Sequence, residues 1–157
     1  MQLTSSAFRQ GAEIPSYFTS DGDDVSPELS WKDAPKETKS FALIVHDPDA
    51  PRTGGFTHWV VYNISATTGH IEEKVPPENE IAGVGIQGKN DGGKIGYVGP
   101  APPSGVHRYF FRLFALDTTL PLGPGATHKE LNAAMKGRIL AQAELMGTYE
   151  KKSQRAA

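Results

Sequence analysis

The amino-acid sequence predicts a mainly β fold with one appended C-terminal helix. Three short segments are apolar, β-branched or aromatic, as strands are, whereas only one segment carries a clear helix-start signal. The 157 residues include 17 Gly and 12 Pro, which is above average usage and indicates short strands joined by many turns. This length suits one domain, predicted at residues 1–150, followed by a short tail at residues 151–157.

Three segments are predicted to form the central strands: Lys39–Val45, Trp59–Ile64 and Tyr109–Leu116. The first ends before Asp47-Pro-Asp-Ala-Pro51, in which the prolines cannot donate to a ladder. Shorter candidate strands are Glu28–Trp31, Ile95–Val98 and Leu140–Tyr149. In the last of these, small or apolar residues alternate with other side chains, which favours a strand, although a helix is the alternative.

The single helix is predicted to begin after Thr127. Thr127 and Glu130 have the spacing of a capping box, in which each side chain satisfies a free backbone N–H at the helix start. The helix is expected to end near Gly137, since Gly is favoured just after a last turn. Leu131, Ala134 and Met135 then share one face, which we expect to pack onto the sheet.

Composition excludes several classes of function. The net charge of −2 offers no basic excess for nucleic acid or anionic lipid. The absence of Cys excludes disulfides, thiolate nucleophiles and Cys-ligated metals. The sequence contains neither a long apolar run nor the start of a signal peptide, so we expect a cytoplasmic protein that does not insert into membranes.

A glycine-rich stretch matches the sequence pattern of a nucleotide-binding loop but lacks its structural context. Residues Gly83 to Gly88 satisfy the G-x-G-x-x-G pattern, and Asn90 stands where a P-loop needs Ser or Thr. No buried strand precedes the stretch and no helix is expected after it, so its context does not support nucleotide binding.

Residues with chemical potential gather at the ends of the predicted strands. Asp47 and Asp49 follow the first central strand, His58 opens the second, and His107 and Tyr109 open the third. Because strand side chains alternate, His107 and Tyr109 point to one face and Arg108 to the other, where it either pairs with a carboxylate or is exposed. Periodicity alone leaves open whether these strand ends meet.

If the strand ends meet, two imidazoles and a phenol provide donors suited to a small phosphate or carboxylate. Each His taken singly is also consistent with a surface or structural role. His46, His70 and His128 show no recurring partner pattern and are interpreted as surface residues. Ser104 has no adjacent base in the sequence, so serine-based hydrolysis has little support.

Three blocks resemble the signature of the phosphatidylethanolamine-binding protein family, in its short bacterial and archaeal Raf-kinase-inhibitor-like branch. The blocks are Asp47–Pro51, the run Phe56–Trp59 with Asn63, and Gly99–Tyr109. Ser26-Pro27 with Trp31, and Gly85–Asn90 before Gly96-Tyr97, also fit that branch, so the resemblance covers roughly residues 8–149.

The resemblance implies a β-sandwich of two antiparallel sheets with Greek-key connections and a small anion pocket at one end. Carried across by position, Asp47, His58, His107 and Tyr109 would bind the ligand. The pocket wall would comprise Asp49, Pro51, Arg108 and Gly99, with backbone N–H groups near Gly99 helping to hold the anion. No cofactor or metal is expected.

The resemblance also points to a cis peptide bond at Ala50–Pro51, which the Pro-rich turn favours independently. A Cys is common in this branch where the chain has Ala101, so a thiol contribution to the pocket is absent. The longer loop and extra C-terminal elements of the eukaryotic members also lack counterparts, which argues against their kinase-regulating and membrane roles here.

The leading functional interpretation is a non-catalytic binding protein for phosphate, a phosphorylated head group or a phosphorylated partner. An acid–base enzyme or hydrolase using His58, His107 and Asp47 is one alternative, and a metal site formed by the same residues is another. A protease or kinase inhibitor acting through its surface is a third alternative. A homodimer is an expected assembly.

Overall fold

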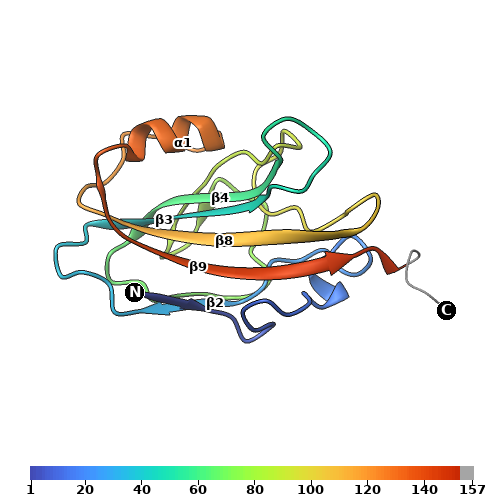
Figure 1. Cartoon of the computed structure of the whole chain (residues 1–157). Coiled ribbons are helices and arrows are strands. Elements are labelled where there is room, and N and C mark those ends of the chain that lie inside the picture. Colours follow the sequence, from blue (N-terminus) through green and yellow to red (C-terminus); the bar gives the residue numbers. More distant parts are fainter. Residues whose placement is uncertain (153–157) are drawn as a thin grey trace.

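A computed structural model describes residues 1–152 and shows two antiparallel sheets packed face to face, with one helix on the outside (Figure 1). The larger sheet has six strands in the order β6-β7-β4-β3-β8-β9. Its members are β3 (Ser40–Asp47), β4 (Phe56–Ser65), β6 (Glu80–Ile81), β7 (Gly85–Gln87), β8 (Val106–Leu116) and β9 (Ile139–Glu150). β8 returns after a long connection to lie beside β3, as in a Greek key.

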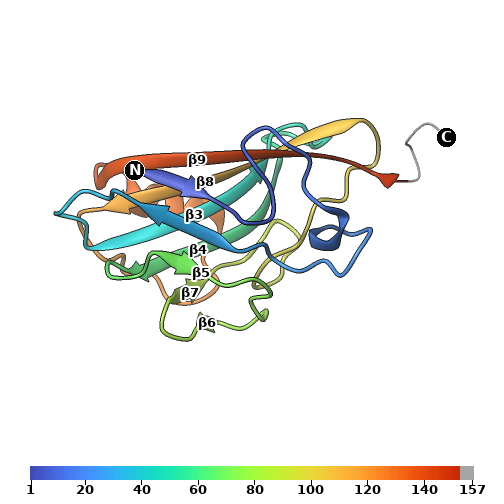
Figure 2. The ribbon, with the colours of Figure 1, turned by 90° about the horizontal axis from the view of Figure 1, so that it is seen from below.

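The smaller sheet covers one face of the larger sheet. Its strands lie in the order β1-β2-β5 and span Gln2–Thr4, Leu29–Lys32 and His70–Ile71. The view from below shows this sheet crossing the larger one (Figure 2). Trp31 of β2 and Phe41 of β3 meet with ring centroids 5.6 Å apart, so the main apolar core lies between the sheets.

The helix α1 (His128–Met135) covers the opposite face of the larger sheet. Leu131 and Met135 are buried against Ala42, Ile44 and Phe114, which form a second apolar cluster. β3 is therefore covered on both faces, which explains its continuous apolar run.

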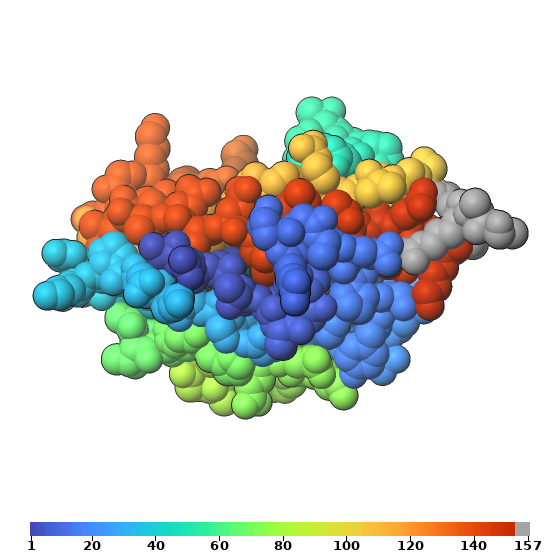
Figure 3. All heavy atoms as spheres, turned by 60° about the horizontal axis from the view of Figure 1, so that its bottom comes forward, coloured from blue at the N-terminus to red at the C-terminus, as the bar shows by residue number. Residues whose placement is uncertain are grey.

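The N-terminal residues run beside β9 on the face opposite α1 (Figure 3). The Ile14 N–H donates to the Thr148 carbonyl, and the Gly11 N–H donates to that of Met146. Gly147 lets this segment approach, since a Cβ there would come within 2.6 Å of Ile14. The segment thereby pairs with part of an otherwise open sheet edge.

The structure confirms the mainly β fold, the three central strands, the strand at Glu28–Trp31 and a strand rather than a helix at Leu140–Tyr149. It also confirms the helix, its Thr127–Glu130 capping box and its end before Gly137. The strand predicted at Ile95–Val98 is wrong. Ile95 makes only an isolated bridge with Lys89. The segment is held by side-chain hydrogen bonds instead, such as the one from the Asn90 side-chain amide to the Gly96 carbonyl.

The predicted cis bond at Ala50–Pro51 is also wrong, since residues 1–152 contain no cis peptide. The turn closes with trans bonds because the Arg52 N–H donates to the Ala50 carbonyl and the Gly55 N–H, at φ +75°, donates to the Arg52 carbonyl.

Within the described residues, α1 has eight residues and no helix is long and apolar enough to span a bilayer. The tail predicted at residues 151–157 lies outside the described residues from 153 onward.

Candidate functional site

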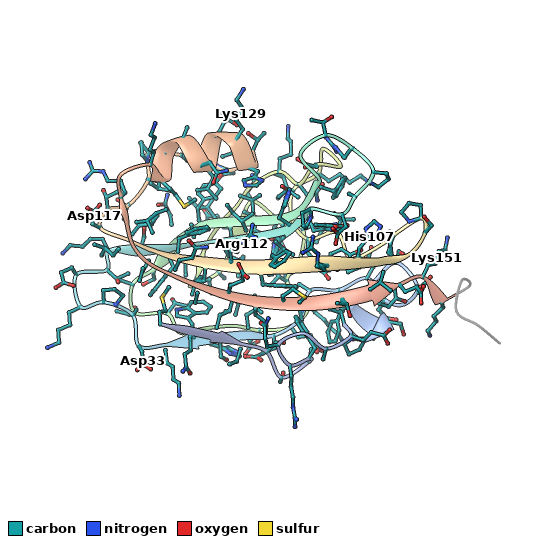
Figure 4. The ribbon with its side chains drawn as sticks, in the orientation of Figure 1. Asp33, His107, Arg112, Asp117, Lys129 and Lys151 are labelled. Atoms are coloured by element: carbon teal, nitrogen blue, oxygen red, sulfur yellow. The ribbon has the colours of Figure 1, made fainter. Side chains whose placement is uncertain are left out.

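The order of the central strands brings the predicted site residues together. β3 lies between β4 and β8 and is antiparallel to both, so its end meets their beginnings. Asp47 ends β3, while His58 and His107 lie near the starts of β4 and β8. Figure 4 shows His107 at the end of the sandwich nearer Lys151, away from Asp33 and Asp117. The ends of the three central strands therefore meet, which the periodicity of the sequence had left open.

These residues line a cavity of about 230 Å³. This is smaller than the roughly 300–1,000 Å³ of pockets for drug-sized ligands, so it suits a small group. Five polar or charged side chains face apolar walls rich in proline. The lining residues are Asp47, Ala50, Pro51, Arg52, Phe56, His58, Val98, Gly99, Ala101, Pro102, Pro103, His107 and Tyr109.

Asp47 contacts His107 rather than standing alone in the cavity. His107 Nδ1 lies 2.6 Å from Asp47 Oδ2, and both side chains are almost completely buried. The other carboxylate oxygen accepts the Asp49 N–H at 2.7 Å. A carboxylate acceptor requires the proton on Nδ1, so Nε2 is the His107 nitrogen left for a ligand. Asp47 therefore orients His107.

His58 is oriented in the same way by the backbone. Its Nδ1 lies 2.7 Å from the Val98 carbonyl oxygen, which can only accept, so Nδ1 carries a proton. Burial lowers the pKa of His58 below its usual range, against an opposing effect of the bond to Val98. The neutral ring leaves Nε2 without a proton, and binding an anion through Nε2 requires protonation.

Tyr109 contributes a hydroxyl without a protein partner. Its oxygen is buried and makes no hydrogen bond, a state shared in residues 1–152 only with Trp31 Nε1. Burial raises the pKa of this hydroxyl, and the carboxylates of Asp47 and Asp49 add to the shift, so it stays a neutral donor. Its ring centroid lies 5.3 Å from that of His58 and 6.5 Å from that of His107.

Asp49 and Arg108 lie beside the cavity and do not line it. Arg108 Nε and Nη2 donate to the two oxygens of Asp49 at 2.9 and 2.8 Å, and the Arg108 N–H also donates to Asp49. The guanidinium holds the pKa of Asp49 at about 2. Arg108 thus pairs with a carboxylate while its side chain stays about half exposed, so the two alternatives that the sequence left open occur together. The pair connects the loop after β3 to β8.

Gly99 lines the cavity, but its own N–H is already used. It donates to Asp24 Oδ1 at 2.8 Å, so of the backbone N–H groups near Gly99 that the resemblance implied, this one is occupied by the protein. A Cβ at Gly99 would collide with Asp24 and with the Phe18 carbonyl, so the close approach requires glycine. Pro51 lines the wall as predicted.

Among the lining residues that sequence reasoning did not assign to the site are Arg52 and Phe56. The Arg52 guanidinium lies 5.5 Å from the centre of the Phe56 ring, which in turn lies 4.7 Å from the His58 ring. Arg52 thus adds a positive charge at the cavity. The sequence signal for Arg52 was its position as a cation directly after Asp47–Pro51. The sequence does not indicate which side chains a loop residue contacts.

His46 and His128 are not the surface residues that the sequence indicated. Both are partly buried and contact Thr57, because β3 and α1 come together there. His70 is exposed and its Nδ1 lies 2.9 Å from Glu28.

The chemistry open to the cavity depends on which side chains line it. Its lining residues include no Ser, Thr, Cys or Lys as a side-chain nucleophile. Within residues 1–152, no group of three His, Asp or Glu side chains is arranged to hold a metal ion. The arrangement offers two imidazoles, a phenol and a guanidinium to a small acceptor.

Comparisons with known proteins agree with this architecture. The family model for phosphatidylethanolamine-binding protein matches residues 4–150. A UPF0098 protein from Methanothermobacter thermautotrophicus is 50% identical over 96% of this chain and 99% of its own length. A UPF0098 protein from Aquifex aeolicus is 49% identical, covering 96% of this chain and 89% of the relative.

Two solved structures are also similar. A phosphatidylethanolamine-binding protein homologue from Chlamydia trachomatis is 45% identical, with a TM-score of 0.85 over 96% of this chain and 97% of the other. Escherichia coli YbcL, described as a new member of the mammalian family, is 33% identical, with a TM-score of 0.90 over 96% of this chain and 98% of the other. This chain belongs to the phosphatidylethanolamine-binding protein family.

Proposed function

We propose that this chain is a non-catalytic binding protein whose cavity takes a small anion, either phosphate or a phosphorylated group on a larger ligand. A larger ligand would place its phosphate group in the cavity. In the cell, such binding would regulate a phosphorylated partner. The observation that carries the proposal is the buried, unpartnered Tyr109 hydroxyl beside two oriented imidazoles. A buried donor without an acceptor costs free energy, and an anion oxygen would relieve that cost.

The charges support an anion only when the imidazoles are protonated. Both Nδ1 atoms already donate to protein oxygens, so each ring gains a second donor at Nε2 on protonation. Arg52 adds a permanent positive charge at the cavity. Asp47 offsets part of this charge but has both oxygens occupied by donors.

An acid–base enzyme is the second candidate, and the Asp47–His107 pair favours it, because a carboxylate-oriented imidazole is a common general base. The cavity lining provides no Ser, Thr, Cys or Lys nucleophile, and its Gly99 N–H is not free to stabilise an oxyanion. Catalysis by this pair would require water or the substrate itself to supply the nucleophile.

A titration with two anions tests the proposal. Sulfate keeps its charge between pH 5.5 and pH 8, so its affinity reports protein protonation alone, while phosphate reports the expected class of ligand. Calorimetry and amide NMR on wild-type protein should show millimolar binding at Tyr109 and His107 that is tighter at pH 5.5 for both anions. His70→Ala, which removes an exposed imidazole from β5, is the matched control and should bind like wild type. Equal affinity at both pH values, or shifts that avoid the cavity, would refute the proposal.

A further inference from the structure

A second histidine cluster lies beside the anion cavity and uses none of its lining residues. Thr57 Oγ1 lies 3.0 Å from His46 Nδ1 and 2.6 Å from His128 Nδ1, and the two rings are 5.3 Å apart. These residues come from three elements: β3, β4 and the first residue of α1. Thr57 is completely buried, so the cluster connects the helix to the sheet inside the molecule.

The hydrogen bonds of this cluster can run in only one direction. A hydrogen bond with the Gly54 backbone raises the pKa of His46 against the larger, lowering effect of burial, so the Gly54 carbonyl accepts from the ring. The atom on that side is Nε2, since a Cβ at Gly55 would come within 2.9 Å of it. The proton of the neutral ring is thus on Nε2, and Nδ1 must accept from the Thr57 hydroxyl. Thr57 has no second hydrogen to give, so His128 Nδ1 must donate to Thr57.

The resulting chain runs from His128 through Thr57 and His46 to Gly54. Gly54 belongs to the loop between β3 and β4, which supplies Ala50, Pro51 and Arg52 to the cavity wall. Other backbone bonds in this loop, such as Arg52 N–H to Ala50 and Gly55 N–H to Arg52, close the turn on itself. The bond from His46 connects the turn to the body of the sheet.

We infer that His46, held in its Nε2–H tautomer by Thr57 and His128, is a positioning residue that fixes the wall of the anion cavity. The effect on anion affinity rests on the proposed function, whereas the tautomer and the fixed loop do not. Thr57 is suited to the role because its backbone is held separately, with its N–H donating to Asp91 Oδ2 and its carbonyl accepting from the Asp91 N–H. Replacing the hydroxyl therefore changes the chain and leaves the strand in place.

Nitrogen NMR of the imidazoles at pH 8 tests the chain directly. His46 should show the Nε2–H tautomer and His128 the Nδ1–H tautomer in wild-type protein. Thr57→Val keeps the shape and removes the hydroxyl, so the His46 tautomers should mix and the Gly55 amide should exchange about two- to tenfold faster. Thr57→Ser should restore both properties. Thr118→Val removes an exposed hydroxyl that bonds Thr119 and should leave both unchanged.

The remaining outcomes separate this inference from the proposed function. Thr57→Val should also weaken sulfate and phosphate binding by about two- to tenfold. If wild type binds neither anion, the proposed function fails, and the tautomer and exchange measurements still decide the inference. An Nδ1–H tautomer at His46, or unchanged Gly55 exchange in Thr57→Val, overturns the inference. Should Thr57→Val not fold, His46→Ala breaks the same chain at the ring that meets the loop, and wild-type Gly55 exchange in it overturns the inference equally.

Discussion

His107 and Asp47, which are 60 positions apart in the chain, meet at 2.6 Å between Nδ1 and Oδ2 inside the cavity. The family resemblance implied both as ligand-binding residues. The contact gives them different roles, because the carboxylate orients the ring and the ring faces the ligand. It also joins the end of β3 to the start of β8 at the site.

Asp47→Asn should weaken binding of phosphate at pH 6, even though it removes a negative charge from an anion pocket. The amide keeps the shape of the carboxylate but holds a positively charged imidazole less well. We expect a loss of about five- to thirtyfold, as for a charge-assisted hydrogen bond of about 1 to 2 kcal/mol.

Calorimetric titration checks this, with Asp33→Asn at the far end of the sandwich as the control (Figure 4). Tighter binding by Asp47→Asn would mean that the carboxylate acts mainly by repelling the anion.

Stability should fall as the pH drops below about 6.5, the ordinary pKa of His. Burial lowers the pKa values of His46, His58 and His128 in the folded protein. Between the folded and unfolded pKa values the unfolded chain binds more protons, so acid favours unfolding. The full stability is present above pH 6.5 and is lost as the pH falls through the lowered values.

The charges around His46 and His128 do not reverse this sign. Arg112 opposes their protonation, while Asp91 favours it and Asp47 also favours it at His46, and burial outweighs all of these. Urea unfolding at pH 5 and pH 8 in buffers without phosphate or sulfate measures the effect. A protein equally stable at both values would show that these rings titrate freely.

His107→Ala and Phe111→Ala should separate ligand binding from folding. Phe111 is buried and packs against Phe8 with ring centroids 5.5 Å apart, so its truncation should cost about 3 to 5 kcal/mol. His107 is also buried, and its loss leaves one oxygen of Asp47 without its partner, which costs about 1 to 3 kcal/mol.

Chemical unfolding compares the two variants, and phosphate-induced stabilisation should disappear only in His107→Ala. A His107→Ala protein that is as unstable as Phe111→Ala and keeps the phosphate effect would make His107 structural.

Much of the fold was readable because strong local signals agreed with the tertiary structure. The continuous apolar run of β3 matches its burial on both faces, and the Thr127–Glu130 pair begins α1 through local bonds alone. The two-residue spacing of His107 and Tyr109 placed them on one face. These features depend on residues close in sequence.

The parts of the fold and of the site that could not be predicted depend on contacts between segments distant in sequence. The strands β5, β6 and β7 have two or three residues each, too few for a periodic pattern. The use of the Gly99 N–H by Asp24 and the meeting of His46 with His128 are set by loop paths. The trans bond at Pro51 follows from the hydrogen bonds of its turn, which the sequence does not reveal.

The most direct test of the anion pocket compares Tyr109→Phe with Tyr97→Phe. Tyr109 is buried and Tyr97 is partly buried, but the Tyr97 hydroxyl donates to the Phe18 carbonyl at 2.7 Å, whereas the Tyr109 hydroxyl has no partner in the protein. Thermal unfolding with and without about 50 mM phosphate at constant ionic strength separates folding from binding. We predict that Tyr109→Phe unfolds at the wild-type temperature or higher without phosphate and loses about 0.5 to 1.5 kcal/mol of anion affinity. Tyr97→Phe should be destabilised and keep the full phosphate effect. A Tyr109→Phe protein that keeps the wild-type phosphate shift would contradict the anion-pocket account.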